Sequence, residues 1–181
     1  MKRLIAVTLG VLLLTGCAAT AKSTGAVKTG LGNNVSIAKS VGATADKAGS
    51  AQVDTVMAAV SFDANGKILA VKIDNAQTKV EFDAKGAIKS DVKAEPKTKV
   101  ELGKDYGMSK ASKIGKEWFE QIAALEKWMV GKTVDQVKAM KVKKVDDSHP
   151  SVPDEADLKS SVTISVQDYI AAVEEAFKNA K

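Results

Sequence analysis

The sequence has few of the residues on which metal sites and hydrolytic active sites most often depend. Its 181 residues include one cysteine and one histidine, so neither an internal disulfide nor a cysteine–histidine zinc site is available. A phosphate-binding loop and a dinucleotide glycine fingerprint are also missing. Aromatic residues make up only 4% of the chain, which leaves little ring surface for a large stacking pocket. The residues therefore define no catalytic set.

Neither sign of charge is present in strong excess. Lysine and arginine number 27 against 22 acidic residues, which gives a formal net charge of +5. The two signs are interspersed and no arginine-rich stripe occurs, so we expect no nucleic-acid partner.

The first residues have the pattern of an export signal. Residues 4–14 form an apolar run behind Lys2 and Arg3, and the run is too short to cross about 30 Å of hydrocarbon, which takes roughly twenty residues. A short positive region followed by such a run is typical of a signal peptide, which is left out of fold reasoning.

The residues after this run resemble the lipobox of bacterial lipoproteins. They read Leu14-Thr15-Gly16-Cys17, with two small residues directly before the only cysteine. The resemblance implies cleavage before Cys17 and lipid on its thiol, which would attach the protein to the outer face of the cell membrane. The alternative is an ordinary secretory signal with an incidental cysteine.

Composition divides the remainder of the chain. Residues 18–50 are rich in Ala, Ser, Thr, Gly and Lys and contain no aromatic residue, so they offer little apolar surface to offset the entropy of ordering. We therefore expect a signal peptide at 1–16, a lipidated flexible tether at 17–50 and a folded domain at 51–181. Because residues from about Val35 could pair with the domain, the boundary is soft.

The domain begins with period-two alternation, which predicts strands at 52–62, 67–74 and 78–82. Asp63–Gly66 and Asp83–Gly86 are turn signals between and after these runs. The similar segments SFDANGKI and EFDAKGAI are interpreted as two like hairpin turns in one antiparallel meander, or else as a true internal repeat.

Helical periodicity follows. Residues 113–130 place one apolar residue on every helical turn, which predicts an amphipathic helix ending at Gly131. The residues of this stripe are Ile114, Trp118, Ile122, Leu125 and Met129. The rings of Trp118, Phe119 and Trp128 either pack in the core or stack on a ligand.

Two more helices are predicted on either side of a loop. Thr133-x-x-Gln136 is a capping box that opens a short helix to about Lys141, and residues 166–179 form the last helix. Between them, residues 142–156 are polar and predict an exposed loop. The predicted fold is α+β: an antiparallel meander with helices packed on one face.

One loop could hold a metal. Asp146 and Asp147 lie close to His149, and carboxylate with imidazole is a metal-ligand set. The alternative, a solvated turn, requires nothing further, so no metal site is assigned.

The order of elements resembles the FMN-binding domain family. The resemblance rests on Val60–Ile68 followed by Val71 and Ile73, and on a D-x-x-[ST]-x-x-[ST] segment before the last helix. In that family a flavin transferase links FMN by a phosphodiester to the last hydroxyl residue of D-x-x-[ST]-G-A-[ST]. Asp157, Ser160 and Thr163 match this motif. The resemblance therefore implies covalent FMN on Thr163, with Asp157 supporting the modification.

The match departs from the motif at two positions, where Ser161 and Val162 replace glycine and alanine. The position itself suits a phosphate, because a capping box of Ser165 with Asp168 would place Thr163 just before a helix N-terminus. The alternative is that residues 160–164 form an edge strand in which Thr163 has no special role.

Two functions of different class follow. In the first, the protein resembles flavinylated lipoproteins that carry electrons outside the cytoplasmic membrane, with a flavin transferase and membrane redox proteins as partners. In the second, the same architecture serves as a non-redox lipoprotein that binds a ligand or a partner. Neither interpretation makes the protein an enzyme with a substrate of its own.

Overall fold

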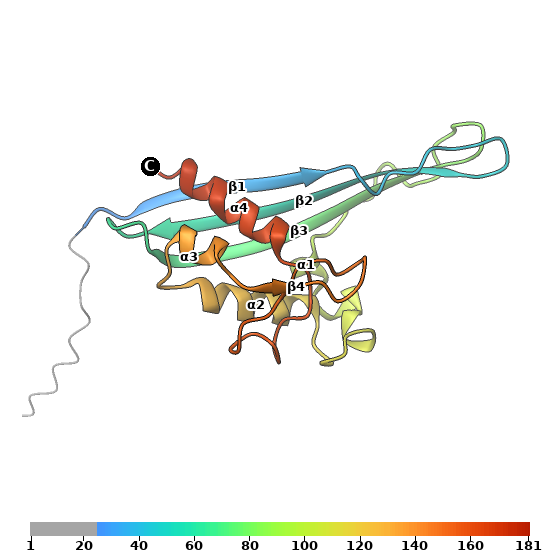
Figure 1. The fold of residues 1–181 in the computed structure, drawn as a ribbon. Coiled ribbons are helices and arrows are strands. Elements are labelled where there is room, and N and C mark those ends of the chain that lie inside the picture. Colours follow the sequence, from blue (N-terminus) through green and yellow to red (C-terminus); the bar gives the residue numbers. More distant parts are fainter. Residues whose placement is uncertain (1–24) are drawn as a thin grey trace, which may run out of the picture.

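Three long antiparallel strands form the centre of the fold (Figure 1). They are β1 (Lys28–Ser36), β2 (Gly49–Phe62) and β3 (Ile68–Phe82), paired in the order β1–β2–β3. The computed structural model describes residues 25–181, so the expected signal peptide and Cys17 lie outside the described residues. The meander confirms the predicted antiparallel sheet, with the two runs predicted at 67–74 and 78–82 joined in one strand.

β1 lies within the stretch that composition predicts to be a flexible tether at 17–50. Residues 28–36 instead pair along their whole length with β2, from Lys28 opposite Phe62 to Ser36 opposite Asp54. The apolar side chains of this strand, Leu31 and Val35, point away from the core and are more than half exposed. The core-facing side of the strand is covered by a helix that packs directly on its glycines. The strand therefore shows no hydrophobic pattern in the sequence.

The two similar turns have the same chemistry. Asp63 Oδ1 accepts hydrogen bonds from the N–H groups of Asn65 and Lys67, and Asp83 Oδ1 accepts them from Lys85 and Ala87. Gly66 and Gly86 occupy the left-handed region at φ 75° and 86°, which glycine adopts without steric cost. The first turn joins two full strands, whereas the second returns the chain only as far as a single bridge between Phe82 and Ile88.

Helices cover one face of the sheet, as predicted (Figure 1). α4 (Gln167–Lys178) lies on β1 and β2, and α2 (Trp118–Met129) lies beside β3 with the short α3 (Val134–Lys138) after it. The chain between β3 and α2 forms one helical turn, α1 (Lys99–Leu102), and two 3-10 turns, η1 (Gly103–Tyr106) and η2 (Met108–Lys110). The core lies between this helical layer and the sheet.

α4 approaches β1 at backbone contact distance. A Cβ atom built on Gly30 would lie 1.8 Å from the carbonyl oxygen of Ala176, and one built on Gly32 would lie 2.0 Å from that of Ala172. These distances are far below van der Waals contact, so only glycine fits at either strand position. Ala58 on β2 is likewise fully buried under the helix layer. Small residues on both elements therefore set the height of α4 above the sheet.

On each outer edge of the sheet, a helix side chain binds a strand amide. On β3, the buried Glu126 of α2 accepts the N–H of Ile73 and the ammonium of Lys72, each at 2.8 Å. On β1, Glu175 of α4 accepts the N–H of Asn33. An edge amide bound in this way is not available to pair with another strand.

The predicted helix ends are partly confirmed. The capping box of Thr133 with Gln136 is present, and Gly131 follows α2 at φ 82°. α2 begins at Trp118 rather than at residue 113, because Glu117 forms a capping box with Glu120 and ends the preceding turn. Trp118 is 1% exposed and belongs to the core, as the packing alternative predicts.

The loop predicted at 142–156 is only partly exposed. Residues 141–150 are exposed, but Val152 and Pro153 are buried and form β5 (Val152–Pro153), which pairs with β4 (Val142–Lys143). A proline can end such a short strand because the N–H it lacks is not needed there.

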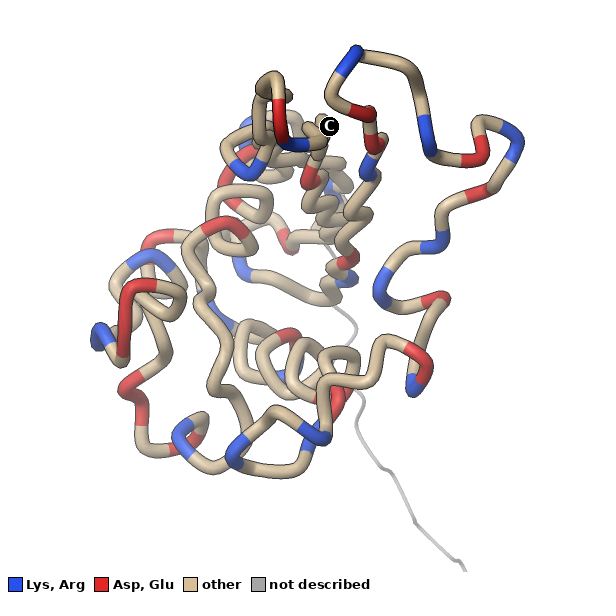
Figure 2. The backbone as a smooth tube through the Cα atoms, turned by 90° about the vertical axis from the view of Figure 1, so that its right-hand side faces the viewer, with Lys and Arg blue, Asp and Glu red and all other residues tan. Residues whose placement is uncertain are grey.

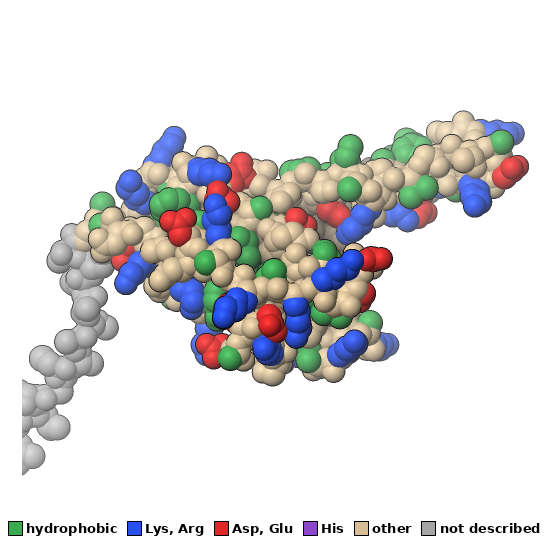
Figure 3. Space-filling view, viewed as in Figure 1, with side chains coloured by type: hydrophobic (Ala, Val, Ile, Leu, Met, Phe, Trp, Pro, Cys, Tyr) green, Lys and Arg blue, Asp and Glu red, His purple; other side chains and the backbone are tan. Residues whose placement is uncertain are grey.

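The sheet extends beyond the helices at one end (Figures 1 and 3). The β1–β2 connection and the chain after Phe82 form this projecting end, which carries six exposed aliphatic side chains: Val35, Ile37, Val41, Val53, Ile88 and Val92. Lysines and acidic residues are interleaved along the described chain (Figure 2). Within residues 25–181, no helix combines the length and the apolar content needed to cross a membrane.

The glycine contact predicts a large effect of one added methyl group. We expect Gly32→Ala to lower the free energy of unfolding by about 2–3 kcal/mol, because the helix backbone must move away from the strand. Urea denaturation measures this change. Gly42→Ala is the matched control: nothing lies within 4 Å of its added Cβ, so its stability should change by about 0.5 kcal/mol or less. Equal effects of the two substitutions would contradict the packing described.

Candidate functional site

Thr163 is fixed by a buried glutamine. Gln121 of α2 is fully buried, and its side-chain oxygen accepts hydrogen bonds from the N–H of Thr163 at 2.8 Å and from its hydroxyl at 3.2 Å. The amide nitrogen of Gln121 donates to Ser112 Oγ and to the carbonyl of Lys116, each at 3.2 Å. The flanking Val162 and Ile164 are buried. The Thr163 hydroxyl is therefore held at a defined position.

Thr163 lines a cavity of about 360 Å³. Most of the lining is apolar, and η2, β5 and residues 162–164 contribute to it. Three lysines surround the cavity: Lys113, Lys143 and Lys159. Lys143 and Lys159 share one carboxylate, Asp154, at 3.2 and 3.1 Å, which holds the pKa of Asp154 below its ordinary value through hydrogen bonds to Lys159 and Lys143. The cavity thus combines apolar surface with cationic side chains and two hydroxyl residues, Ser112 and Thr163.

The other two residues of the matched motif lie outside this cavity. Asp157 and Ser160 are exposed and do not line it. They belong to a turn that is attached to the core by Leu158, which is 2% exposed. Of the three residues assigned to the cofactor, only Thr163 faces a cavity.

The predicted capping box of Ser165 with Asp168 is wrong. α4 begins after Val166, which makes no side-chain cap, and Ser165 Oγ instead accepts the N–H of Ser151 at 3.3 Å. Thr163 therefore is not placed at the first amides of the helix. The edge strand considered for residues 160–164 is wrong too, since the segment pairs with no strand.

The aspartates near His149 are engaged in local contacts. Asp146 Oδ1 lies 2.8 Å from His149 Nδ1 and also accepts the N–H groups of Ser148 and His149, which lowers the pKa of Asp146. Asp147 pairs with Lys144 at 2.6 Å. No group of three potential ligands that could hold a metal ion is found in the part of the chain that the structure describes.

A second cavity, of about 560 Å³, adjoins the first between the sheet and residues 147–150. Its most unusual residue is Lys99, at the start of α1, which is 8% exposed. The ammonium lies 4.9 Å from the ring centre of Tyr106 and 5.3 Å from that of Trp118, a cation–π arrangement. Burial lowers the pKa of Lys99 from its ordinary value of 10.5 to about 8.

Asn75 and Tyr169 line the same cavity. Asn75 is 6% exposed, and its Oδ1 is the one buried side-chain polar atom without a hydrogen-bond partner among residues 25–181. Tyr169 accepts the indole N–H of Trp118 at 3.0 Å, and burial raises its pKa to about 12. Polar groups thus converge on this cavity from β3, α1, α2 and α4.

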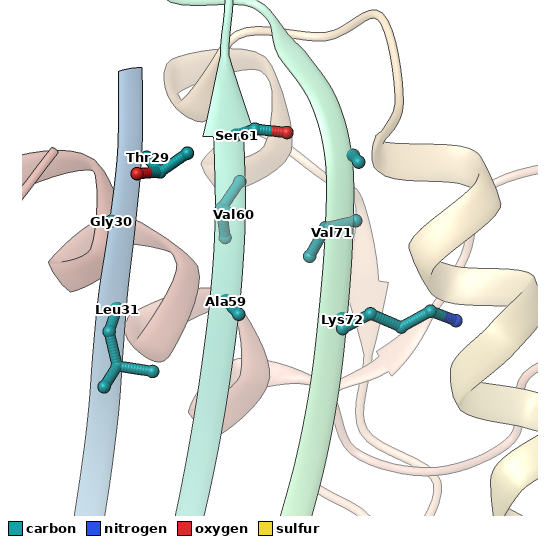
Figure 4. A pocket seen from close by; sticks show the side chains of 9 residues that line it. Thr29, Gly30, Leu31, Ala59, Val60, Ser61, Val71 and Lys72 are labelled. Carbon is teal, nitrogen blue, oxygen red and sulfur yellow. The ribbon is translucent and has the colours of Figure 1, made fainter. Parts of the chain in front are cut away.

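The uncovered face of the sheet carries only a shallow depression. Figure 4 shows Leu31, Ala59 and Lys72 side by side on three strands, with Thr29 and Ser61 above them. Its side chains are small or exposed and none of its polar groups is buried, so we assign no site to it.

Sequence reasoning missed the second cavity, although one signal was present. In β3 the inward positions alternate as Val71, Ile73 and Asn75, so a polar residue continues an apolar series. Lys99 gives no such signal, because its burial depends on α1 folding back onto the ring of Trp118.

The comparisons with known proteins give no relative. No family model matches the chain, and neither a curated protein nor a solved structure matches it.

The buried amine predicts an unusual stability profile. At pH values below about 8 Lys99 is charged in both states, and its folded-state burial costs about 3 kcal/mol for this shift of pKa. Between about pH 8 and pH 10.5 the unfolded chain binds the proton and the folded chain does not, so stability rises with pH. We expect Lys99→Met to stabilise the protein by roughly 2–3 kcal/mol at pH 7, with a gain that shrinks toward pH 10.5.

Chemical denaturation at pH 7 and pH 10 measures both parts of this expectation. Lys79→Met is the control, because Lys79 is exposed and pairs only with Glu81 on the same strand. It should change stability by about 0.5 kcal/mol or less at both pH values. A Lys99→Met protein that is less stable than the parent at pH 7 would contradict the account.

Proposed function

We propose that the chain is a lipoprotein anchored through Cys17 to the outer face of the cell membrane, which carries electrons on FMN attached to Thr163. The observation that supports this function is the position of Thr163, whose hydroxyl is bound by Gln121, in the lining of a cavity that also includes three lysines. A phosphodiester at Thr163 needs a hydroxyl that a modifying enzyme can reach. It also needs cations close to the phosphate and apolar surface for the ring system.

The residues present fit such a group in three respects. Thr163 is half-buried rather than enclosed, and its hydroxyl is held by Gln121. Lys113, Lys143 and Lys159 supply positive charge around it, and lysine is a common phosphate partner. Apolar side chains including Met108 and Pro153 supply the surface for the ring. Bound FMN would contribute reversible one- and two-electron transfer.

Serine in place of the motif's glycine is compatible with the local backbone. No residue other than glycine has a positive φ in the described part of the chain, so Ser161 is not held in a conformation that requires glycine. Val162 is fully buried, and its side chain contributes to the core. Val162 thus has a structural role in this chain, and neither departure from the motif requires a strained backbone in the segment that presents Thr163.

The non-redox alternative also has an observation in its favour. The cavity around Thr163 has no tryptophan, tyrosine or phenylalanine in its lining, so an isoalloxazine ring would rest on aliphatic side chains alone. A protein with the same anchor and fold would then bind an anionic ligand without covalent attachment.

The flavin proposal predicts a covalent adduct at one residue. We expect the full chain, co-expressed in a bacterium with a flavin transferase, to gain about 438 Da and to absorb near 450 nm, as an FMN phosphodiester requires. Both signals should vanish in Thr163→Ala and persist in Thr163→Ser, which keeps a hydroxyl at the same position. Intact-mass spectrometry and visible absorbance make the measurement.

Ser160→Ala is the matched control, because Ser160 is an exposed hydroxyl three residues away that does not line the cavity. It should leave the adduct unchanged. A colourless protein of unmodified mass, or an adduct that survives Thr163→Ala, would overturn the flavin proposal and leave the ligand-binding alternative.

A further inference from the structure

Lys99 is a buried cation without a counter-ion. It forms no ion pair among residues 25–181, and its ammonium lies over the rings of Tyr106 and Trp118. An unpaired buried charge is costly and is rarely kept without a partner. Its ammonium lines the second cavity, so a bound anion is the simplest partner that the structure leaves room for.

The nearest carboxylates are already used by other groups. Asp54 pairs with Lys39 at 2.7 Å and accepts the side-chain amides of Gln52 and Gln77 at 2.8 and 3.2 Å. Asp74 accepts the backbone N–H groups of Asn75 and Val100. These carboxylates act on Lys99 only at longer range. The protein therefore does not supply the anion itself.

Asn75 provides a second unmet bond in the same cavity. Its buried Oδ1 accepts nothing, although a buried acceptor without a donor costs about 1–3 kcal/mol. The side chain of Asn75 also acts to lower the pKa of Tyr169 against the larger effect of burial, and the Tyr169 hydroxyl accepts the indole N–H of Trp118. Trp118 also contacts the ammonium of Lys99, and both Lys99 and Asn75 line this one cavity.

The charge around the cavity limits the type of anion. Its lining includes three aspartates and two lysines: Asp54, Asp147, Asp168, Lys39 and Lys99. Such a lining opposes a phosphate dianion, which would meet one free cation against several carboxylates. A small molecule with one carboxylate has a single negative charge, so the aspartates repel it less than they would a dianion. If it also has a hydrogen-bond donor, it can satisfy both Lys99 and Asn75.

We propose that this second cavity binds a small monocarboxylate bearing an ammonium or hydroxyl group, with its carboxylate on Lys99 and its donor on Asn75 Oδ1. A free amino acid or a hydroxy acid has this chemistry. The aromatic rings of Tyr106, Trp118 and Tyr169 contribute to the apolar part of the wall, together with Val56, Met108 and Ile164. The site goes beyond the proposed flavin function and does not depend on it.

The probes form two matched series. Alanine, lactate and propionate differ only in an ammonium, a hydroxyl or a hydrogen beside the carboxylate, and their phenyl-substituted counterparts extend the same comparison to a larger side chain. The full chain with Trp128→Phe, purified in detergent, keeps Trp118 as its only tryptophan. Its emission then reports on the cavity, and calorimetry on the unsubstituted chain gives an independent affinity.

We expect at least one amino or hydroxy acid to bind at millimolar concentration or below, and about tenfold more tightly than the matching unsubstituted acid. Lys99→Met should weaken this binding by at least about tenfold, the loss expected for one charge-assisted hydrogen bond, while Lys99→Arg retains part of it. Asn75→Leu should remove the preference for the substituted acid and leave the protein folded, because no satisfied bond of Oδ1 is lost.

Two controls separate this site from the surface and from the flavin site. Lys79→Met removes an exposed lysine, and Thr163→Ala removes the proposed flavin attachment. Neither should change the affinity. The proposal is overturned if no probe binds, if the unsubstituted acids bind equally well, or if Lys99→Met binds as the parent does. Loss of binding in Thr163→Ala would instead place the ligand in the first cavity, which also overturns it.

Discussion

The fold depends on one close contact, the seating of α4 directly on the backbone of β1. Gly30 and Gly32 leave no room for a side chain beneath the carbonyl oxygens of Ala176 and Ala172, and fully buried alanines complete the interface. Once α4 is seated, its C-terminal end also covers the outer edge of β1, where Glu175 accepts the N–H of Asn33. A strand with almost no apolar pattern thereby becomes part of the core layer, and the sheet gains its third strand.

The position of α4 determines the position of the segment before it, and with it both cavities. Thr163 lies four residues before the first residue of the helix and is fastened to α2 through Gln121. Tyr169, in the first turn of the helix, meets Trp118 edge to face at 5.9 Å. The fold keeps two unfavourable groups here, the ammonium of Lys99 and the amide oxygen of Asn75. Costs of this kind are concentrated where a protein binds something, whereas other buried polar side chains, such as Gln121 and Glu126, have hydrogen-bond partners.

The sequence predicted the elements whose pattern is local. The alternation in β2 and β3, the aspartate turns, the stripe of α2 and the cap at Thr133 follow from nearest neighbours on one strand or helix. β1 was not predictable, because what makes it a strand is the shape of α4 some 142 residues later, as the bond from Asn33 to Glu175 illustrates. At the candidate site, position 163 was found through a motif, but the environment of Lys99 arises only when distant segments meet. The Ser165 cap failed for a similar reason, since a tertiary partner, Ser151, takes its hydroxyl.

The central claim is therefore that residues 28–36 and α4 form one cooperative unit that places both cavities. Native-state amide hydrogen exchange tests it most directly, residue by residue. The account predicts that the paired amides of β1 exchange as slowly as those of β2, near the limit set by global unfolding. Exchange of β1 amides at the rate of an unstructured chain, with β2 protected, would contradict the account and return residues 28–36 to a tether.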